Sequence, residues 1–275
     1  MLRPAVAGAA ERMNRVPKVT IDFWLIKLMA VTVGETAADY LAVNLGFGLT
    51  TTSLIMTGAL IVALILQFAQ KRYVPWAYWI AVVMISVVGT LVTDNLTDNL
   101  GVALEVSTAW FSVALVVTFV IWFAYEGTLS IHTIFTTRRE LFYWLAILFT
   151  FSLGTAAGDL LAESYDLGYL TTGFIFAGVI AAITLAYLLG LNGILAFWLA
   201  YIFTRPLGAS FGDLLAQPVD YGGLGFGTIV TSVTFLLAIA AIIIYMTITK
   251  DGEEAAAEEG VEGNSKEAGA ESEAS

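Results

Sequence analysis

Four copies of one spaced motif, Trp-x9-Gly-x4-Asp, lie inside apolar segments of this chain. In each copy a glycine follows the tryptophan by ten residues, and an aspartate follows the glycine by five. The tryptophans are Trp24, Trp79, Trp144 and Trp198; the glycines are Gly34, Gly89, Gly154 and Gly208; the aspartates are Asp39, Asp94, Asp159 and Asp213. Because a carboxylate at the centre of a bilayer costs about 2.5–3.5 kcal/mol on insertion scales, an aspartate in a membrane span indicates a functional site.

The apolar character of the whole chain predicts a polytopic membrane protein. Apolar residues make up 59% of the 275, charged residues make up 13%, and the mean hydropathy is +0.84. About 20 consecutive apolar residues are needed to cross the hydrocarbon core. Eight segments meet this requirement: 20–43, 50–69, 76–96, 102–124, 141–162, 169–189, 192–214 and 226–248. We therefore predict an all-α fold with eight transmembrane helices.

The distribution of positive charge predicts the orientation. Lysine and arginine lie in the N-terminal segment, at Lys71-Arg72 and at Arg138-Arg139. The alternate connections, 44–49, 97–101, 163–168 and 215–225, contain neither residue type. Short loops rich in lysine and arginine face the cytoplasm. We therefore expect a multi-pass protein of the cell membrane with both termini in the cytoplasm.

The tryptophan spacing divides the chain into four two-helix repeats. Because a pair of helices returns to its starting side, all four copies point the same way and are related by an axis along the membrane normal. The predicted order is a basic N-terminal segment (1–19), repeat 1 (20–70), repeat 2 (71–125), a cytoplasmic loop (126–140), repeat 3 (141–190), repeat 4 (191–249) and an acidic, disordered cytoplasmic tail (250–275). The first helices of the four repeats are then expected to surround a common centre.

Two stretches of the chain resemble a known family. They are Gly-Glu-Thr-Ala-Ala-Asp-Tyr at 34–40 and Gly-Thr-Ala-Ala-Gly-Asp at 154–159. Together with the tryptophan of each repeat, they resemble bacterial and archaeal membrane-anchored proteins built from four tandem two-helix repeats of unknown function. The resemblance covers residues 18–249 and implies the same helical outline; it implies no particular chemistry.

Composition excludes several kinds of site. The chain has no cysteine and one histidine, His132, so thiolate chemistry and multi-histidine haem or zinc sites are excluded. Residues 250–275 hold nine acidic residues and two lysines, and thus −7 of the net charge of −11; this composition is typical of disorder. No basic face is present to bind nucleic acid. We expect no cofactor, and the oligomeric state stays open.

Each motif combines a packing surface with an acidic side chain. A small residue follows each glycine by four positions, at Ala38, Thr93, Gly158 and Gly212. Such a strip lets a neighbouring helix approach closely, so the motif tryptophans and glycines are predicted to pack the repeats together. If each tryptophan marks the cytoplasmic interface, the aspartate lies about 22 Å further along the helix, in the outer half of the bilayer.

The four aspartates are predicted to bind a cation or a proton. Three readings stay open: an outward-opening cation site or pathway, bonds that hold neighbouring helices together, or positions in the hydrated outer interface. Converging carboxylates suit hard ions such as Mg²⁺, Ca²⁺ or Mn²⁺, and an organic cation is a further option. The predicted metal ligands are Asp39 and Asp159.

Three charged residues break the symmetry of the repeats. Glu35 precedes Asp39 by one helical turn and supplies either a second carboxylate to the cation site or a bond to a neighbouring hydroxyl. Arg205 is expected to be the counter-ion of a carboxylate at membrane depth, with snorkelling as the alternative; Pro206 after it is expected to kink or break the helix. Lys27, one turn into its span, is expected to snorkel to the membrane surface.

These features predict a proton-coupled secondary transporter of a cation. Export from the cell is one of the two directions of transport that stay open. The aspartates would bind the cation, Glu35 would assist proton exchange, and Arg205 would balance charge in the empty site. The alternative is a non-transporting structural or regulatory membrane protein, in which the aspartates lock helices and the acidic tail recruits a partner. No nucleotide-binding loop or HExxH motif is present. An intramembrane aspartyl protease needs one asymmetric pair of carboxylates, so an enzyme is not expected.

Overall fold

The computed structural model describes residues 14–249, and every regular element in this range is helical. The long helices are α2 (Ile21–Asp39), α3 (Leu49–Phe68), α4 (Pro75–Asp94), α5 (Leu104–Glu126), α6 (Thr137–Asp159), α7 (Gly168–Leu188), α8 (Gly193–Ala216) and a last helix, Thr228–Thr249. Short 3₁₀ turns cover Ile131–Thr133 and Val219–Tyr221. The all-α prediction is confirmed. The predicted disorder of the tail falls on residues outside the described range.

Seven of the eight long helices between residues 14 and 249 have the length and composition needed to cross a membrane. The exception is α2, which carries four charged residues: Asp22, Lys27, Glu35 and Asp39. The structure therefore supports a polytopic membrane protein. Helix α2 nevertheless lies inside the bundle, and its Lys27 and Glu35 side chains are buried.

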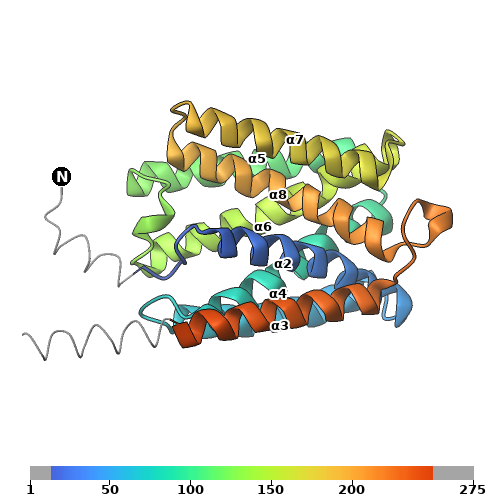
Figure 1. The fold of residues 1–275 in the computed structure, drawn as a ribbon, viewed down its shortest axis with the longest axis horizontal. Coiled ribbons are helices and arrows are strands. Elements are labelled where there is room, and N and C mark those ends of the chain that lie inside the picture. The colour runs from blue at the N-terminus through green and yellow to red at the C-terminus, as the bar shows by residue number, and fades with distance from the viewer. Residues whose placement is uncertain (1–13, 250–275) are drawn as a thin grey trace, which may run out of the picture.

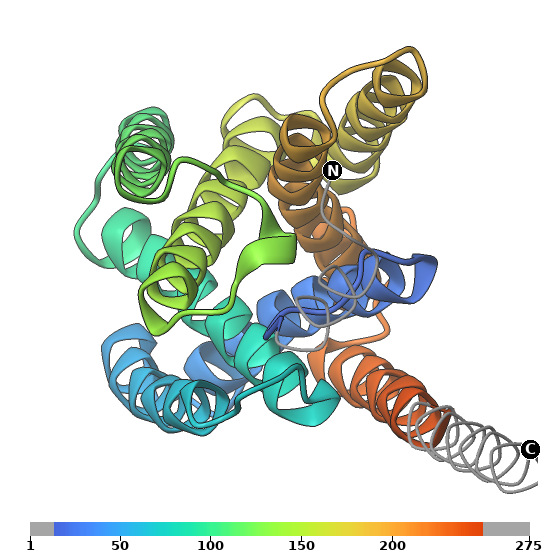
Figure 2. The same ribbon diagram turned by 90° about the vertical axis from the view of Figure 1, so that its left-hand side faces the viewer.

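Four helices form an inner ring, as the repeat geometry predicted. Helix α2 packs against α4 and α8, and α6 packs against the same two helices. The first helices of all four repeats thus close on one another (Figure 2). The helices run side by side along the long axis of the molecule (Figure 1).

The second helix of each repeat lies outside the ring, against the first helix of the following repeat. Helix α3 packs on α4, α5 on α6 and α7 on α8. The last helix returns to repeat 1, where Ser232 Oγ lies 2.6 Å from Thr36 Oγ1 of α2. Large apolar side chains such as Leu54, Trp110 and Phe174 are exposed on the outer helices, as expected of a surface that faces lipid.

The motif glycines lie at the seams between neighbouring inner helices. A Cβ atom added to any of the four would overlap a side chain of the adjacent helix: Gly34 with Ser86, Gly89 with Phe151, Gly154 with Arg205, and Gly208 with Val31. Each partner stands seven residues after the tryptophan of its own repeat. The same contact therefore recurs four times around the ring and closes repeat 4 onto repeat 1.

We call the two ends of the ring the tryptophan end, where Trp79, Trp144 and Trp198 lie, and the aspartate end, where the four motif aspartates lie. Residues 14–20 dock at the tryptophan end. The backbone carbonyl of Asn14 accepts a hydrogen bond from the backbone N–H of Tyr73 at 2.9 Å, and its side-chain Oδ1 accepts one from the backbone N–H of Ile134 at 3.0 Å. The segment before α2 thus joins two connections from different repeats.

Candidate functional site

Each inner helix presents a stripe of side chains, spaced four residues apart, to the centre of the ring. We number positions from the motif tryptophan, so that the stripe contains positions −1, +3, +7, +11 and +15, with about 6 Å of helix between layers. The −1 layer is Phe23, Tyr78, Tyr143 and Phe197; the +3 layer is Lys27, Val82, Ile147 and Tyr201; the +7 layer is Val31, Ser86, Phe151 and Arg205; the +11 layer is Glu35, Thr90, Thr155 and Ala209; the motif aspartates form the +15 layer.

Exposure changes sharply along this stripe. Every side chain of the +3, +7 and +11 layers is buried. In the +15 layer, Asp39, Asp94 and Asp159 are half-buried, and Asp213 is 7% exposed. The axis is therefore closed through its middle and becomes accessible at the aspartates.

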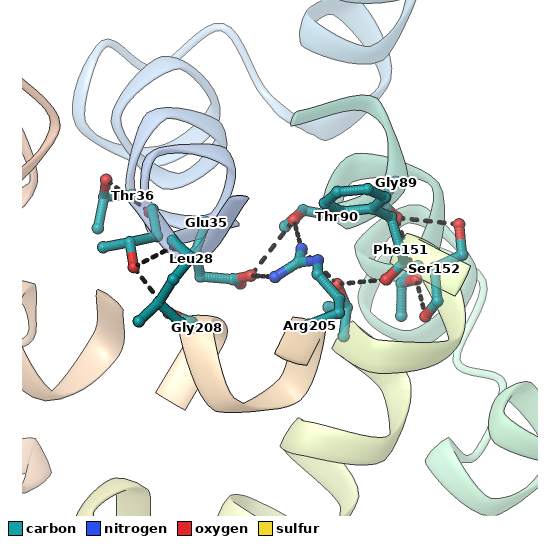
Figure 3. A network of polar contacts seen from close by, with 12 residues as sticks. Leu28, Glu35, Thr36, Gly89, Thr90, Phe151, Ser152, Arg205 and Gly208 are labelled. Carbon is teal, nitrogen blue, oxygen red and sulfur yellow. Dashed lines mark hydrogen bonds and ion pairs between the residues drawn. The ribbon is translucent and has the colours of Figure 1, made fainter. Parts of the chain in front are cut away.

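A buried ion pair lies where the inner helices meet (Figure 3). Arg205 Nη1 donates a hydrogen bond to Glu35 Oε2 at 3.0 Å, and both side chains are almost fully enclosed, with exposed fractions of 0% and 8%. Arg205 Nη2 donates to the hydroxyls of Thr155, at 2.7 Å, and Thr90. Thr90 in turn donates to Glu35 Oε2 at 3.3 Å. The structure thus pairs Arg205 with Glu35, and Arg205 also interacts electrostatically with the motif aspartate Asp159.

Hydrogen bonds across the seams hold the helices that carry this pair. Thr32 Oγ1 donates to the carbonyl of Gly208 at 3.1 Å, and Ser152 Oγ donates to the carbonyl of Gly89 at 3.2 Å. Thr32 and Ser152 occupy the same repeat position, eight residues after their tryptophans. The bonds join a motif glycine to the next repeat at two seams, which fixes the spacing between the helices around the ion pair.

Pro206 does not break its helix. Helix α8 continues without interruption from Gly193 to Ala216. The proline ring packs into the seam with α6, where its Cδ would lie 3.0 Å from a Cβ at Gly154 and its Cβ 3.6 Å from one at Gly158. The two glycines leave room for the ring, so the loss of one backbone donor is accommodated inside a continuous helix.

The expectation that Lys27 snorkels to the surface is wrong. Its side chain is fully buried, and Nζ donates to the carbonyl of Tyr201 at 2.9 Å. The ammonium also lies 4.0 Å from the centroid of the Tyr201 ring, a cation–π arrangement. Lys27 faces the centre of the ring, where α4 and α8 flank its helix, and its stem cannot reach the membrane surface.

The motif aspartates stand at a change in helix geometry. Asp39, Asp94 and Asp159 are the last residues of α2, α4 and α6. A π-helical turn follows each of them, at Tyr40–Asn44, Asn95–Asn99 and Leu160–Ser164. Asp213 lies inside α8 and has no such turn after it. Single π turns are frequent at functional sites, and the sequence pattern gave no sign of them.

The motif aspartates lie near Glu35, at the aspartate end of the ring. Electrostatic contacts link Glu35 to all four of them. Asp39 accepts a hydrogen bond from Gln217 Nε2 at 3.1 Å. The carboxylates of Asp94, Asp159 and Asp213 have no protein hydrogen-bond donor among residues 14–249. Three of the four are therefore free to accept a ligand.

A formed metal centre is not part of this arrangement. Within the described range, no three Asp, Glu, His or Cys side chains lie close enough to hold one metal ion. The four aspartates are separate carboxylates, one from each inner helix. The metal-binding role of Asp39 and Asp159 stays a prediction.

An aromatic cluster closes the ring at the tryptophan end. Trp79, Trp144 and Trp198 are 1%, 3% and 3% exposed, and their rings contact Tyr78, Tyr143 and Tyr201. Trp24 is half-buried. The three buried tryptophans pack inside the protein and do not face lipid, as interfacial tryptophans would. Their place in the sequence motif reflects packing between repeats.

Sequence reasoning missed one buried acid. Glu140 is fully buried, accepts a hydrogen bond from Arg15 Nη1 at 2.6 Å, and accepts another from Gln67 Nε2 at 2.9 Å. It joins the segment before α2 to α6 and α3 beneath the aromatic cluster. Trp144 Nε1 also donates a hydrogen bond to Glu140 at 3.4 Å. The one signal in the sequence was that Glu140 precedes Trp144 by four residues, which places both side chains on the same helix face.

Comparison with known protein families gives four matches to one model, whose description is Repeat of Unknown Function (DUF347). The matches cover residues 23–73, 77–128, 142–189 and 196–251. They follow the four helix pairs of the fold. The chain belongs to the DUF347 family. This confirms the resemblance drawn from the motif. No curated protein and no solved structure matches this DUF347 protein. Its function must therefore be argued from the site.

Proposed function

We propose that this DUF347 protein is a secondary transporter that exchanges a cation for protons across the cell membrane. The observation that carries the proposal is the buried Glu35–Arg205 pair, which lies on the ring's axis directly beneath four aspartates. Carboxylates at membrane depth are costly and mark ion pathways and proton relays. Here five of them lie along one axis, which is buried at Glu35 and becomes accessible at the aspartates.

The free state of three aspartates favours binding over a purely structural role. If the carboxylates only locked helices together, each would be expected to accept hydrogen bonds from its neighbours. Asp39 does so through Gln217, whereas Asp94, Asp159 and Asp213 find no protein donor within residues 14–249. Oxygen ligands of this kind suit Mg²⁺, Ca²⁺ or Mn²⁺.

The charges at the middle of the axis favour a carrier over an open pore. Arg205 and Lys27 lie in adjacent buried layers and would repel a cation moving along a continuous channel. A cation bound at the aspartates can instead compete with Arg205 for Glu35. The ring then has two states, one with Glu35 paired to Arg205 and one with Glu35 bound to the cation, and cation binding shifts the population toward the second. When the cation is absent, Arg205 neutralises the charge of Glu35.

Transport into proteoliposomes tests this proposal. Purified protein is reconstituted and screened with Mn²⁺, Mg²⁺ and Ca²⁺ under an imposed pH gradient. The double variant D39N/D159N and the single variant E35Q should lose cation movement while remaining folded. Asp22→Asn is the matched control, because Asp22 is exposed on the same helix as Asp39, and it should transport as the wild type does. Full activity in D39N/D159N would refute the proposal.

The second candidate is a non-transporting structural or regulatory protein. The bond between Gln217 and Asp39 favours it, because it ties the end of α8 to the end of α2. On this reading, the same Asn substitutions lower thermal stability without any transport defect. Removal of residues 251–275 would abolish the role, whereas a carrier should tolerate that truncation.

A further inference from the structure

The two halves of the axis present different polar atoms. On the aspartate side of Arg205, the axis holds carboxylates and threonine hydroxyls. On the tryptophan side, the −1 and +3 layers hold an amine, three phenol hydroxyls and apolar side chains, with no carboxylate. Hard metal cations need several oxygen ligands, whereas a proton needs only a chain of groups that donate and accept hydrogen bonds. The tryptophan half therefore suits protons alone.

Lys27 is the charged member of these two layers. Its ammonium is fully buried and has one hydrogen bond, to the carbonyl of Tyr201. No carboxylate pairs with it in the part of the chain that the structure describes. Arg205 of α8 interacts with it electrostatically, and the Tyr201 ring of α8 lies against its ammonium. Tyr78 from α4 and Tyr143 from α6 stand in the neighbouring −1 layer. An ammonium that is buried without a counter-ion is costly, so loss of its proton relieves an unfavourable charge.

Tyrosine hydroxyls lead from Lys27 to the tryptophan end. The Tyr201 hydroxyl is buried without a hydrogen bond, and it interacts electrostatically with the Tyr143 hydroxyl. The Tyr143 hydroxyl lies 2.5 Å from that of Tyr78. The Tyr78 ring packs edge-on against Tyr73, with centroids 5.8 Å apart. Tyr73 belongs to the connection between α3 and α4, so the series of tyrosines runs from Tyr201, whose ring lies against the Lys27 ammonium, to a loop.

Phe151 places Lys27 next to the ion pair. Lys27 Nζ lies 5.7 Å from the centroid of the Phe151 ring, and Arg205 Cζ lies 5.5 Å from it. While Glu35 accepts the hydrogen bond of Arg205, it compensates part of the positive charge. A cation that binds Glu35 breaks the ion pair between Glu35 and Arg205. The charge of Arg205 is then no longer compensated, and its repulsion of Lys27 becomes stronger. Cation binding at one end of the axis thus promotes proton loss in its middle.

We infer that Lys27 carries the coupling proton and that the hydroxyls of Tyr201, Tyr143 and Tyr78 pass it to the tryptophan end. This inference rests on the proposed function. Lys27 releases one proton and keeps the lone pair on Nζ as a neutral amine. Each hydroxyl accepts a proton on its oxygen and gives up its own, so no electron is transferred. Return of a proton restores the ammonium when the cation leaves.

The protonation of Lys27 can be measured without any transported cation. The chain has lysines at 18, 27, 71, 250 and 266, so ¹⁵N NMR of the side-chain nitrogens in lipid nanodiscs gives few signals. Lys27→Met and Lys71→Met assign the buried and the exposed residue. We expect the Lys27 signal to change between those of an ammonium and an amine as the pH is varied over the range in which the protein stays folded. A Lys27 signal that stays the same over this range would overturn the inference.

Two tyrosine variants test the route. Tyr143→Phe removes the hydroxyl in the middle of the series and should slow proton exchange between Lys27 and water at least tenfold. Tyr245→Phe, which removes an exposed hydroxyl on the last helix, should leave the exchange rate unchanged. Equal rates in both variants would contradict the tyrosine route. Because Tyr143→Phe keeps Lys27 in place, this test holds even where Lys27→Met fails to fold.

Proteoliposomes that contain Mn²⁺ and an internal pH indicator separate this inference from the proposed function. Lys27→Met should exchange Mn²⁺ for Mn²⁺ but move no protons, whereas Lys71→Met should keep the wild-type ratio of protons to Mn²⁺. A wild-type ratio in Lys27→Met would overturn the inference and leave the transporter standing. Absence of movement of Mn²⁺, Mg²⁺ and Ca²⁺ in the wild type would overturn the proposed function, and the NMR result would still decide whether Lys27 exchanges its proton.

Discussion

At the scale of single residues, the centre of the ring depends on one ion pair that is shared by all four repeats. Arg205 comes from repeat 4, Glu35 from repeat 1, and the hydroxyls of Thr90 and Thr155 complete the set from repeats 2 and 3. Removing one partner of a buried pair is more damaging than neutralising both, because the remaining charge has no compensation.

Glu35→Ala should therefore destabilise the protein by about 3–5 kcal/mol. The double variant E35Q/R205Q, which keeps hydrogen-bonding side chains and removes both charges, should be more stable than Glu35→Ala. Thermal unfolding in detergent, followed by tryptophan fluorescence, measures the difference. A Glu35→Ala variant as stable as the wild type would mean that the pair contributes nothing to the fold.

The sequence indicated that Glu35 and Arg205 were special because they broke a fourfold pattern. It did not indicate that they pair with each other, since they lie 170 positions apart and the ring closure that joins them depends on packing between repeats. Lys27 was misjudged for the same reason. Its position one turn into a span allows snorkelling only if the helix faces lipid on that side.

At the scale of helices, four glycine seams set the distance between the inner helices. Their regular spacing was visible in the sequence, because glycine at a fixed offset from tryptophan recurs in every repeat. The π turns after three of the aspartates were not visible, because apolar periodicity carries no signal that distinguishes them from α-helix.

Gly208→Ala should destabilise the ring by about 1–3 kcal/mol, because the added Cβ would overlap Val31 and lie 3.3 Å from the Leu28 carbonyl oxygen. Gly58→Ala is the matched control within helix α3. Nothing lies within 4 Å of the added methyl group there, and alanine is the better helix former, so stability should stay the same or rise. Chemical denaturation of both variants gives the comparison; equal effects would argue against a tight seam at Gly208.

At the scale of the whole molecule, two facts about the sequence predicted the number of repeats and the closed ring. The spacing within the motif is the same in all four copies, and the number of predicted spans is even. Orientation in the membrane rests on the positive charge of the loops at the tryptophan end. The chain contains no cysteine, so single cysteines can be introduced without a background signal.

Lys71→Cys and Glu105→Cys place a thiol at opposite ends of the bundle, and both positions are exposed. A membrane-impermeant maleimide applied to intact cells should label Glu105→Cys, whereas Lys71→Cys should react only after permeabilisation. This result would put the tryptophan end in the cytoplasm. Labelling in the reverse pattern would invert the orientation, and the aspartates would then open toward the cytoplasm.

The most direct measurement of the central claim is calorimetric titration of the purified protein with Mn²⁺, Mg²⁺ and Ca²⁺ in two buffers of different ionisation enthalpy. We predict that at least one cation binds to the wild type and releases protons. In E35Q and in D39N/D159N, its affinity should fall by tenfold or more, which corresponds to about 1.4 kcal/mol. Equal affinity in D39N/D159N and the wild type would contradict a cation site built from the motif aspartates.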